Sequence, residues 1–204
     1  MKMKKIYIVF IASNFKSGKL IRFFTRGRYN HIAFSHEPYI SEVYSFARYN
    51  YYESLLGGFG PEYSNRYLCQ GKDIAIKICQ YDVAEEHYER IKEKLDYYGK
   101  TKTRYNILSV LTYPLKKQVE LPDTHTCISF MLELLELNNN ITINKLETML
   151  SKSVIYEGNL SNRLSYVAAL DEDEFFVRKK RLDVWRKNCL YYYWLFATLV
   201  RLHI

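Results

Sequence analysis

The sequence predicts an α+β fold in which an antiparallel sheet packs against one buried helix. Most of its short β-rich runs lie in the first 80 residues, and two of them are separated by only four residues, as in an antiparallel hairpin. Apolar residues at helical spacing dominate the segments that follow. A hydrophobic content of 48% in 204 residues is ordinary for a globular protein with a core, so one main domain is expected.

The N-terminal part of the chain is expected to hold three strands and one helix. Residues 5–13 carry an apolar, β-branched run at the short limit for a secretory signal, so they predict a buried strand. Residues 17–26 have apolar side chains at helical spacing, and residues 29–35 and 40–47 predict the hairpin. The glycine-containing segment 48–66 predicts a long connection, which in a compact domain is usually functional or mobile.

The remaining elements follow from periodicity and turn residues. The patterns predict strands over residues 73–80 and 154–157, and helices over residues 83–98, 105–113, 123–137 and 143–150. In the helix over 123–137, apolar residues at positions i, i+3, i+4 and i+7 form one stripe, which indicates a buried face. Asp123 and Thr124 are its start signals, so Cys127 is expected in the first turn.

Charge and cysteine usage exclude several classes of protein. The net charge of +8 includes basic clusters at residues 2–5 and 178–181, but no zinc-finger, helix-turn-helix or aromatic RNA-binding motif accompanies them. Nucleic-acid binding is therefore not expected, and the basic runs are taken as solvated faces. The four cysteines are scattered without a CxxC pair, so neither a disulfide framework nor a metal or cofactor site is predicted. This usage favours a reducing compartment, and we expect a cytoplasmic protein.

Cys127 is the cysteine best placed for chemistry. A thiol reacts as its thiolate, and the first turn of a helix stabilises that anion through unpaired backbone N–H groups and the helix dipole. Cys79 is expected in a strand and Cys189 in an apolar tail, where a thiol behaves as a small hydrophobe. The alternative to a reactive Cys127 is that it, too, is only a small buried hydrophobic residue.

His31 and Glu42 are the predicted partners of Cys127. In the expected hairpin register, His31 lies opposite Tyr44, and Glu42 is its diagonal neighbour at about 7 Å between backbones. A histidine beside a carboxylate is the base and orienter of a nucleophilic triad. Glu62, just past the glycine-rich stretch, is the alternative orienter.

An ordered set of short segments resembles a known family. The segments are LIRFFTR at 20–26, YNHIA at 29–33, EVYSF at 42–46, GGF at 57–59, CISF at 127–130 and YEGNL at 156–160. Their order is similar to that of the permuted NlpC/P60 enzymes, a papain-like group that includes the lecithin:retinol acyltransferase-like proteins. In that group the histidine comes first, then an acidic or polar residue, and the cysteine last. Two departures from the family pattern are Ile128 before Ser129 and Ala47 in place of a glycine.

The resemblance implies a circularly permuted papain-like fold and acyl transfer through a thioester. Cys127 would attack the carbonyl of an amide or ester, His31 would hold and then return the proton, and Glu42 would fix the imidazole. The substrate implied is a peptide or a lipid. The residues expected to line the site are Tyr29, Tyr44, Glu62 and Ser129.

Three other arrangements compete with this one. A non-catalytic papain-like module that binds a peptide or a lipid would keep the pocket but have an unreactive Cys127. A zinc site could be built from His31, His125 and Cys127, although only three ligands can be named. An unpermuted order would use Cys69 as nucleophile and His125 as base, but no helix is predicted after Cys69 to stabilise the thiolate.

The C-terminal part is expected to be a separate extension. Residues 1–168 form the predicted catalytic domain, and residues 169–204 a basic and aromatic helical segment. Its apolar run, residues 189–200, is much shorter than the ~20 residues that a spanning helix needs. Residues 176–204 are therefore expected to contact a membrane surface, to self-associate, or to dock on the chain's own core.

Overall fold

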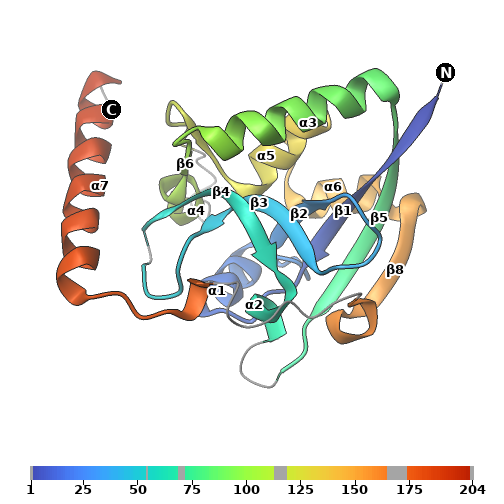
Figure 1. Ribbon diagram of the computed structural model, residues 1–204, viewed down its shortest axis with the longest axis horizontal. Coiled ribbons are helices and arrows are strands. Elements are labelled where there is room, and N and C mark those ends of the chain that lie inside the picture. The colour runs from blue at the N-terminus through green and yellow to red at the C-terminus, as the bar shows by residue number, and fades with distance from the viewer. Residues whose placement is uncertain (1, 54, 69–71, 113–118, 165–173, 203–204) are drawn as a thin grey trace.

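An eight-stranded sheet forms the centre of the protein in a computed structural model that describes residues 2–53, 55–68, 72–112, 119–164 and 174–202 (Figure 1). The strand order is β7-β6-β4-β3-β2-β1-β5-β8, and every pair is antiparallel except β6 and β7. The strands are β1 (Met3–Ile11), β2 (His31–Ser35), β3 (Glu42–Arg48), β4 (Gly57–Tyr63), β5 (Ala75–Ala84), β6 (Arg104–Tyr105), β7 (Thr124–His125) and β8 (Val154–Asn159).

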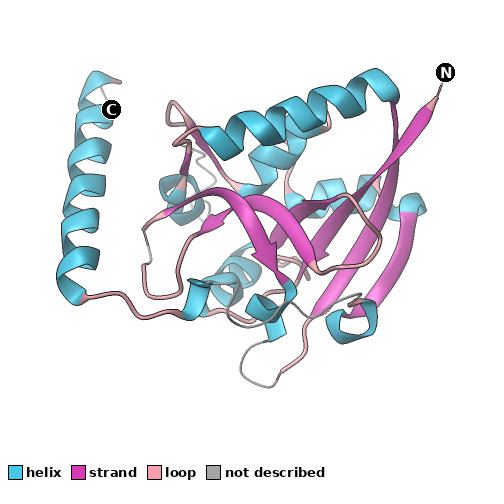
Figure 2. Cartoon of the chain, in the orientation of Figure 1, coloured by secondary structure: helices cyan, strands magenta, loops and turns pink. Residues whose placement is uncertain are grey.

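The helices lie around this sheet (Figure 2). They are α1 (Lys16–Thr25), α2 (Ser64–Leu68), α3 (Glu85–Lys100), α4 (Ile107–Thr112), α5 (Cys127–Leu134), α6 (Ile143–Met149) and α7 (Arg181–Arg201). Short 3₁₀ turns cover Ser151–Ser153, Leu160–Arg163 and Glu174–Phe176. Helices α3 and α5 pass over the same face of the sheet, and α5 packs against β2 and β3.

From Ile6 to Ile11 the inner strand β1 is buried on both faces, which explains the continuous run of apolar and aromatic residues there. Side chains alternate along a strand, so Ile8 and Phe10 join the core under α3 and α5, whereas Val9 and Ile11 join a second core on the opposite face. Both cores are built from buried residues, so the sheet separates two apolar layers.

An aromatic cluster fastens α5 to the sheet. The ring of Phe130 lies 5.3 Å from Phe46 and 5.4 Å from Phe59 between centroids, and Tyr98 of α3 lies 5.8 Å from it. Such tilted and edge-on pairs add to the stabilisation from burial alone. The N-terminus of α5 is thereby held against the middle of the sheet.

The α+β prediction is confirmed, and most predicted elements are present within a few residues of their expected bounds. The prediction of a long connection over residues 48–66 was wrong, because this segment contains β4 and the start of α2. Strand β4 pairs with β3 over its whole length, and a side chain at Gly57 or Gly58 would collide with Ala47 or Tyr49. The glycines permit a close strand approach here and do not mark a loop.

The hairpin of β2 and β3 is antiparallel as predicted, but its register differs by three residues. Tyr44 pairs with Phe34 and not with His31. The expected register assumed a tight turn, whereas six residues, 36–41, separate the two strands. A longer connection shifts every cross-strand neighbour.

Helix α7 stands at one end of the molecule, beside β6 and α4 (Figure 1). Its attachment is small: Tyr191 is buried, the guanidinium of Arg104 lies 4.3 Å from the ring of Trp194, and Lys187 lies 3.5 Å from Glu53. The helical prediction for the extension holds from Arg181, and its expected boundary at residues 168–169 falls outside the described residues. None of the helices among the described residues has the length and apolar character required to cross a bilayer.

Candidate active site

Cys127 is the first residue of α5. Thr126 caps the helix: its Oγ1 accepts from the Ser129 N–H at 3.1 Å, and the Ser129 Oγ accepts from the Thr126 N–H at 2.8 Å. This reciprocal pair leaves the N–H of Cys127 outside the helix's own hydrogen bonds. The helix was predicted to start at Asp123, but Asp123 has a positive φ of 53°, and the helix begins four residues later. The thiol therefore lies directly at the positive end of the helix dipole.

His31, the first residue of β2, presents its imidazole to Cys127. The side chain of His31 is 13% exposed. Burial alone would lower the pKa of His31, but its electrostatic and hydrogen-bonding interactions with Glu62 and with Cys127 raise it to about 10. The imidazole is therefore held as an imidazolium at neutral pH.

Glu62 of β4 orients the imidazole. Its Oε1 accepts from His31 Nε2 at 2.7 Å and from the hydroxyl of Ser45, which itself lies 3.2 Å from Nε2. Its Oε2 accepts from the Tyr67 hydroxyl at 2.6 Å and from Arg66 Nη1 at 3.4 Å. Burial would raise the pKa of Glu62, but His31 and these donors hold it well below its usual range. A buried carboxylate with four donors is fixed in position and in charge.

Glu42 does not reach His31, contrary to the expectation from the hairpin. It hydrogen-bonds to Tyr44, and its charge acts on His36. The three-residue register shift explains this difference, because it moves Glu42 along the strand away from His31. The alternative orienter, Glu62, lies beside the imidazole instead. Strand β4 pairs Glu62 with Val43 of β3, and β3 is the neighbour of β2, which carries His31.

Two hollows meet at this pair of residues. The cysteine hollow, about 540 Å³, is lined by Cys127, and the histidine hollow, about 450 Å³, is lined by His31. Asn30 and Tyr105 line both, so the hollows adjoin at the pair. Cavities of this size accommodate small organic groups.

The predicted site-lining residues divide into two groups. Tyr29 and Ser129 line the cysteine hollow, although Tyr29 is 1% exposed and Ser129 also caps α5. Glu62 lines the histidine hollow. Tyr44 lines neither hollow and stacks on Phe59 in the core, because the observed register turns it away from His31.

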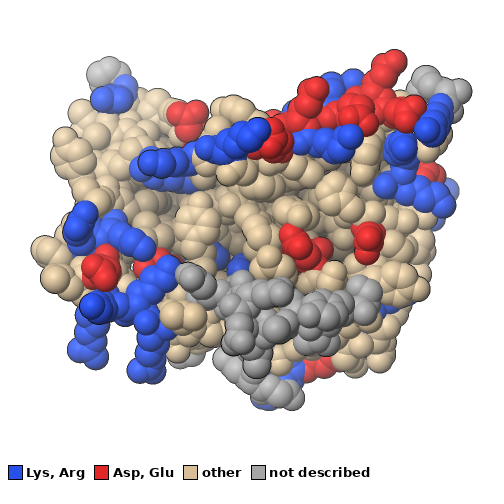
Figure 3. Space-filling model, viewed as in Figure 1, with Lys and Arg blue, Asp and Glu red and all other residues tan. Residues whose placement is uncertain are grey.

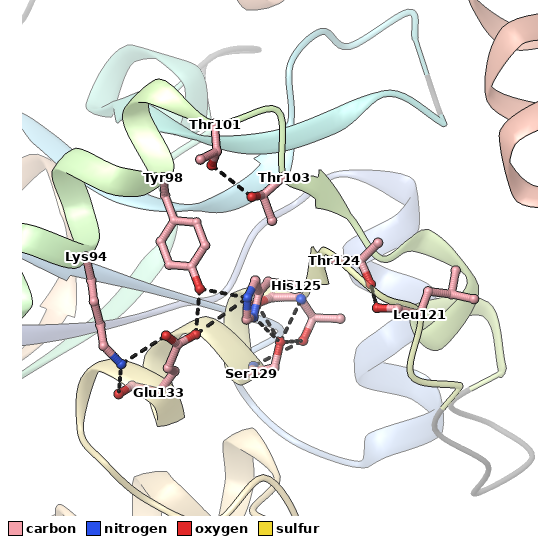
Figure 4. A network of polar contacts seen from close by, with 10 residues as sticks. Lys94, Tyr98, Thr101, Thr103, Leu121, Thr124, His125, Ser129 and Glu133 are labelled. Atoms are coloured by element: carbon pink, nitrogen blue, oxygen red, sulfur yellow. Dashed lines mark hydrogen bonds and ion pairs between the residues drawn. The ribbon is translucent and has the colours of Figure 1, made fainter. Parts of the chain in front are cut away.

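His125 belongs to a separate network on the wall of the cysteine hollow (Figure 4). Its Nε2 lies 2.8 Å from the Tyr98 hydroxyl, which donates to Glu133 at 2.7 Å, and Lys94 donates to the same carboxylate group at 2.9 Å. Burial lowers the pKa of His125, and Glu133 only partly opposes this. The ring is thus neutral, and because the Tyr98 hydroxyl gives its only proton to Glu133, Nε2–H of His125 donates to the Tyr98 oxygen.

This network is inconsistent with the alternative zinc site of His31, His125 and Cys127. The ring of His125 faces Tyr98 and Glu133, and no cluster of three or more His, Cys, Asp or Glu side chains in the described part of the chain could hold a metal ion. The alternative nucleophile, Cys69, lies outside the described residues. The alternative base, His125, is held in the wall network.

Several site residues gave no sequence signal. Ser45, Tyr67 and Arg66 all contact Glu62, and Tyr105 lies in β6 between the two hollows. The one sequence signal among these contacts is the i, i+4 spacing of Glu62 and Arg66 at the start of α2, which is typical of an ion pair. The other contacts join separate strands.

The surface charge is unevenly distributed. Acidic and basic side chains alternate along the ridge formed by α3, whereas basic side chains gather near the segment that leads into α7 (Figure 3). Arg178, Lys180 and Arg181 of that segment are exposed. The basic surface is therefore located apart from the Cys127 helix.

Comparisons of the chain with protein-family models, with curated proteins and with solved structures gave no match.

Proposed function

We propose that this protein is a thiol hydrolase or acyltransferase of the permuted papain-like type, which acts on an amide or ester bond of a peptide or lipid. The observation that carries the proposal is the contact between the Cys127 thiol at the start of α5 and an imidazole whose pKa is raised to about 10. A thiolate and an imidazolium side by side form the resting state of a cysteine nucleophile. The order of histidine, glutamate and cysteine along the chain supports the permuted type.

The chemistry follows from the positions of three side chains. The Cys127 sulfur attacks the carbonyl carbon, and the negative charge on the carbonyl oxygen develops near the N–H of Cys127. His31 gives its proton to the leaving amine or alcohol as that bond breaks, and a thioester remains on Cys127. Water or an acceptor alcohol or amine then loses its proton to His31, attacks the thioester and frees the Cys127 thiolate beside the imidazolium. Glu62 keeps the imidazole oriented through both steps.

Site-resolved alkylation tests the nucleophile. Iodoacetamide at pH 6.5 is expected to modify Cys127 at least about tenfold faster than the exposed Cys189, and His31→Ala should remove this advantage. Cys79 is a second reference, because burial raises its pKa to about 11 and should keep it unmodified. A Cys127 that reacts no faster than Cys189 would identify a non-catalytic binding module.

Turnover of an activated ester tests the full reaction. With p-nitrophenyl acetate, we expect an acetyl group on Cys127, detected by peptide mass spectrometry and removed by hydroxylamine, with continuous release of p-nitrophenol. Cys127→Ser and His31→Ala should each abolish acetylation at that position. Acetylation that persists on another residue in Cys127→Ser would contradict the assigned nucleophile.

A further inference from the structure

The histidine hollow contains a cation that the catalytic arrangement does not use. Arg48, the last residue of β3, is half-buried and lines this hollow together with His31 and Glu62. No carboxylate of the described chain pairs with its guanidinium, whereas Arg66 in the same hollow is an ion-pair partner of Glu62. A half-buried guanidinium without a counter-ion next to a reactive pair is a binding group for an anion.

No carboxylate in the described part of the chain compensates the positive charge of Arg48. The guanidinium lies 5.9 Å from the ring centroid of Phe15. Burial lowers the pKa of Arg48, Tyr105 and Tyr51 partly oppose this, and the neighbouring cation Arg66 lowers the pKa further, so an anion would stabilise the guanidinium. Glu62, the carboxylate in this hollow, is occupied by four donors and is not among the charges that act on Arg48. The positive potential of the hollow is thus left for a ligand.

The other walls indicate what the anion is attached to. Phe15, Tyr51, Tyr67 and Phe175 present aromatic rings to the hollow, and Phe15 lies 5.5 Å from Phe175 between ring centroids. The cysteine hollow is different, because its charged lining includes Glu120, Glu133 and Glu136 with Lys94. An anionic group is therefore favoured on the histidine side of the scissile bond and disfavoured on the other side.

We propose that the histidine hollow binds an anionic group of the substrate, a carboxylate or a phosphate carried on an apolar or aromatic moiety, with Arg48 as its ligand. This inference rests on the proposed function, because it assigns one side of the substrate to that site. The substrate is then an anionic amide or ester whose bond to be cut lies within a few atoms of the charge. Arg48 acts in substrate selection and not in the chemical step.

Paired alkylating reagents test the inference without knowledge of the substrate. The pairs are iodoacetate with iodoacetamide, and the longer N-iodoacetylglycine with N-iodoacetylglycinamide, which differ only in the carboxylate. In the wild type, the anionic member of at least one pair should modify Cys127 faster than its neutral partner. Arg48→Gln should lower the rate of that anionic reagent roughly tenfold and change the neutral rate less than about twofold. Arg48→Lys should retain part of the preference, because it keeps the charge but not the planar fork.

A matched control and an internal reference separate the outcomes. Arg163→Gln removes the same charge from a residue that stacks on Tyr39 and Tyr156 and lines neither hollow, so it should leave the preference unchanged. Cys189, measured in the same digest, corrects for reagent reactivity. Neutral reagents that modify Cys127 no faster than Cys189 would count against the proposed function. An equal anionic preference in the wild type and in folded Arg48→Gln would overturn the role of Arg48.

Protection experiments identify the anion. Benzoate or inorganic phosphate should slow the modification of Cys127 by iodoacetamide in the wild type, whereas benzamide should not. Protection by benzoate indicates a carboxylate on an aromatic or apolar group, and protection by phosphate alone indicates a phosphoryl group. Protection that is as strong in Arg48→Gln as in the wild type would also overturn the inference.

Discussion

At the scale of single residues, the site depends on which glutamate faces His31. Glu62 and Glu42 lie on neighbouring strands, but only Glu62 is buried with donors on both oxygens. A carboxylate in such a setting fixes the ring and stabilises its positive charge. The sequence alone offered both glutamates and favoured the wrong one.

The first prediction compares these two glutamates. Glu62→Gln should reduce the alkylation rate of Cys127 at pH 6.5 by about 100-fold, within the range typical of lost acid–base groups. The pKa of His31, followed by ¹⁵N NMR of the imidazole, should fall from about 10 toward its ordinary value. The reason is that the amide keeps the volume of the carboxylate but not its charge.

Glu42→Gln is the matched control for this prediction. It removes a carboxylate that contacts Tyr44 and not His31, so the rate should change less than about threefold. If Glu42→Gln had the larger effect, the assignment of Glu62 as orienter would be wrong.

The second prediction concerns the pH dependence of stability. The pKa of His31 is raised in the folded protein, so its stabilising contribution is complete below the unfolded value of about 6.5 and is lost as the pH rises toward 10. The wild type should therefore lose more unfolding free energy between pH 6.5 and pH 10 than His31→Gln does, by more than about 1 kcal/mol. Urea denaturation at both pH values measures this difference, and parallel losses in the two proteins would refute it.

At the scale of the elements, the start of α5 sets the position of the nucleophile. Sequence signals gave the existence of this helix and its buried face, but placed its first residue too early. The capping box of Thr126 and Ser129 determines the start, because it satisfies two N–H groups in the first turn. Since Cys127 follows the cap directly, the cap also fixes the direction of its side chain.

The third prediction tests this cap. Thr126→Ala should reduce the unfolding free energy by about 1 kcal/mol, and Thr126→Ser should restore most of it. The alanine variant should also slow the alkylation of Cys127 while leaving Cys79 buried and unmodified. A stability loss without any change in Cys127 reactivity would show that the cap does not position the thiol.

At the scale of the whole molecule, the apolar residues divide into a packed core and an exposed helix. Phe130 is fully buried in the aromatic cluster, whereas Phe196 of α7 is 68% exposed. Both are aromatic residues within apolar stretches of helix, so the local sequence pattern does not show which one is buried. Only their surroundings in the folded protein determine this.

The fourth prediction uses this pair. Phe130→Ala should cost about 3–5 kcal/mol of unfolding free energy, because it leaves a cavity between α5 and the sheet. Phe196→Ala should change the unfolding free energy by less than about 0.5 kcal/mol. Thermal and urea denaturation of the two variants will compare them directly, and a comparable cost at Phe196 would mean that α7 is packed against a partner in solution.

The sequence by itself determined the α+β class and most of the strands and helices, because these depend on local periodicity and turn chemistry. The order of His31 before Cys127 is read from it directly. It also placed Cys127 near the start of a helix. Only the tertiary structure decided that Glu62 faces His31, that Arg48 lies in the histidine hollow, and that Tyr44 is turned into the core. These facts depend on how β3 pairs with β2 and β4, and strand register is set by connections and packing between distant segments.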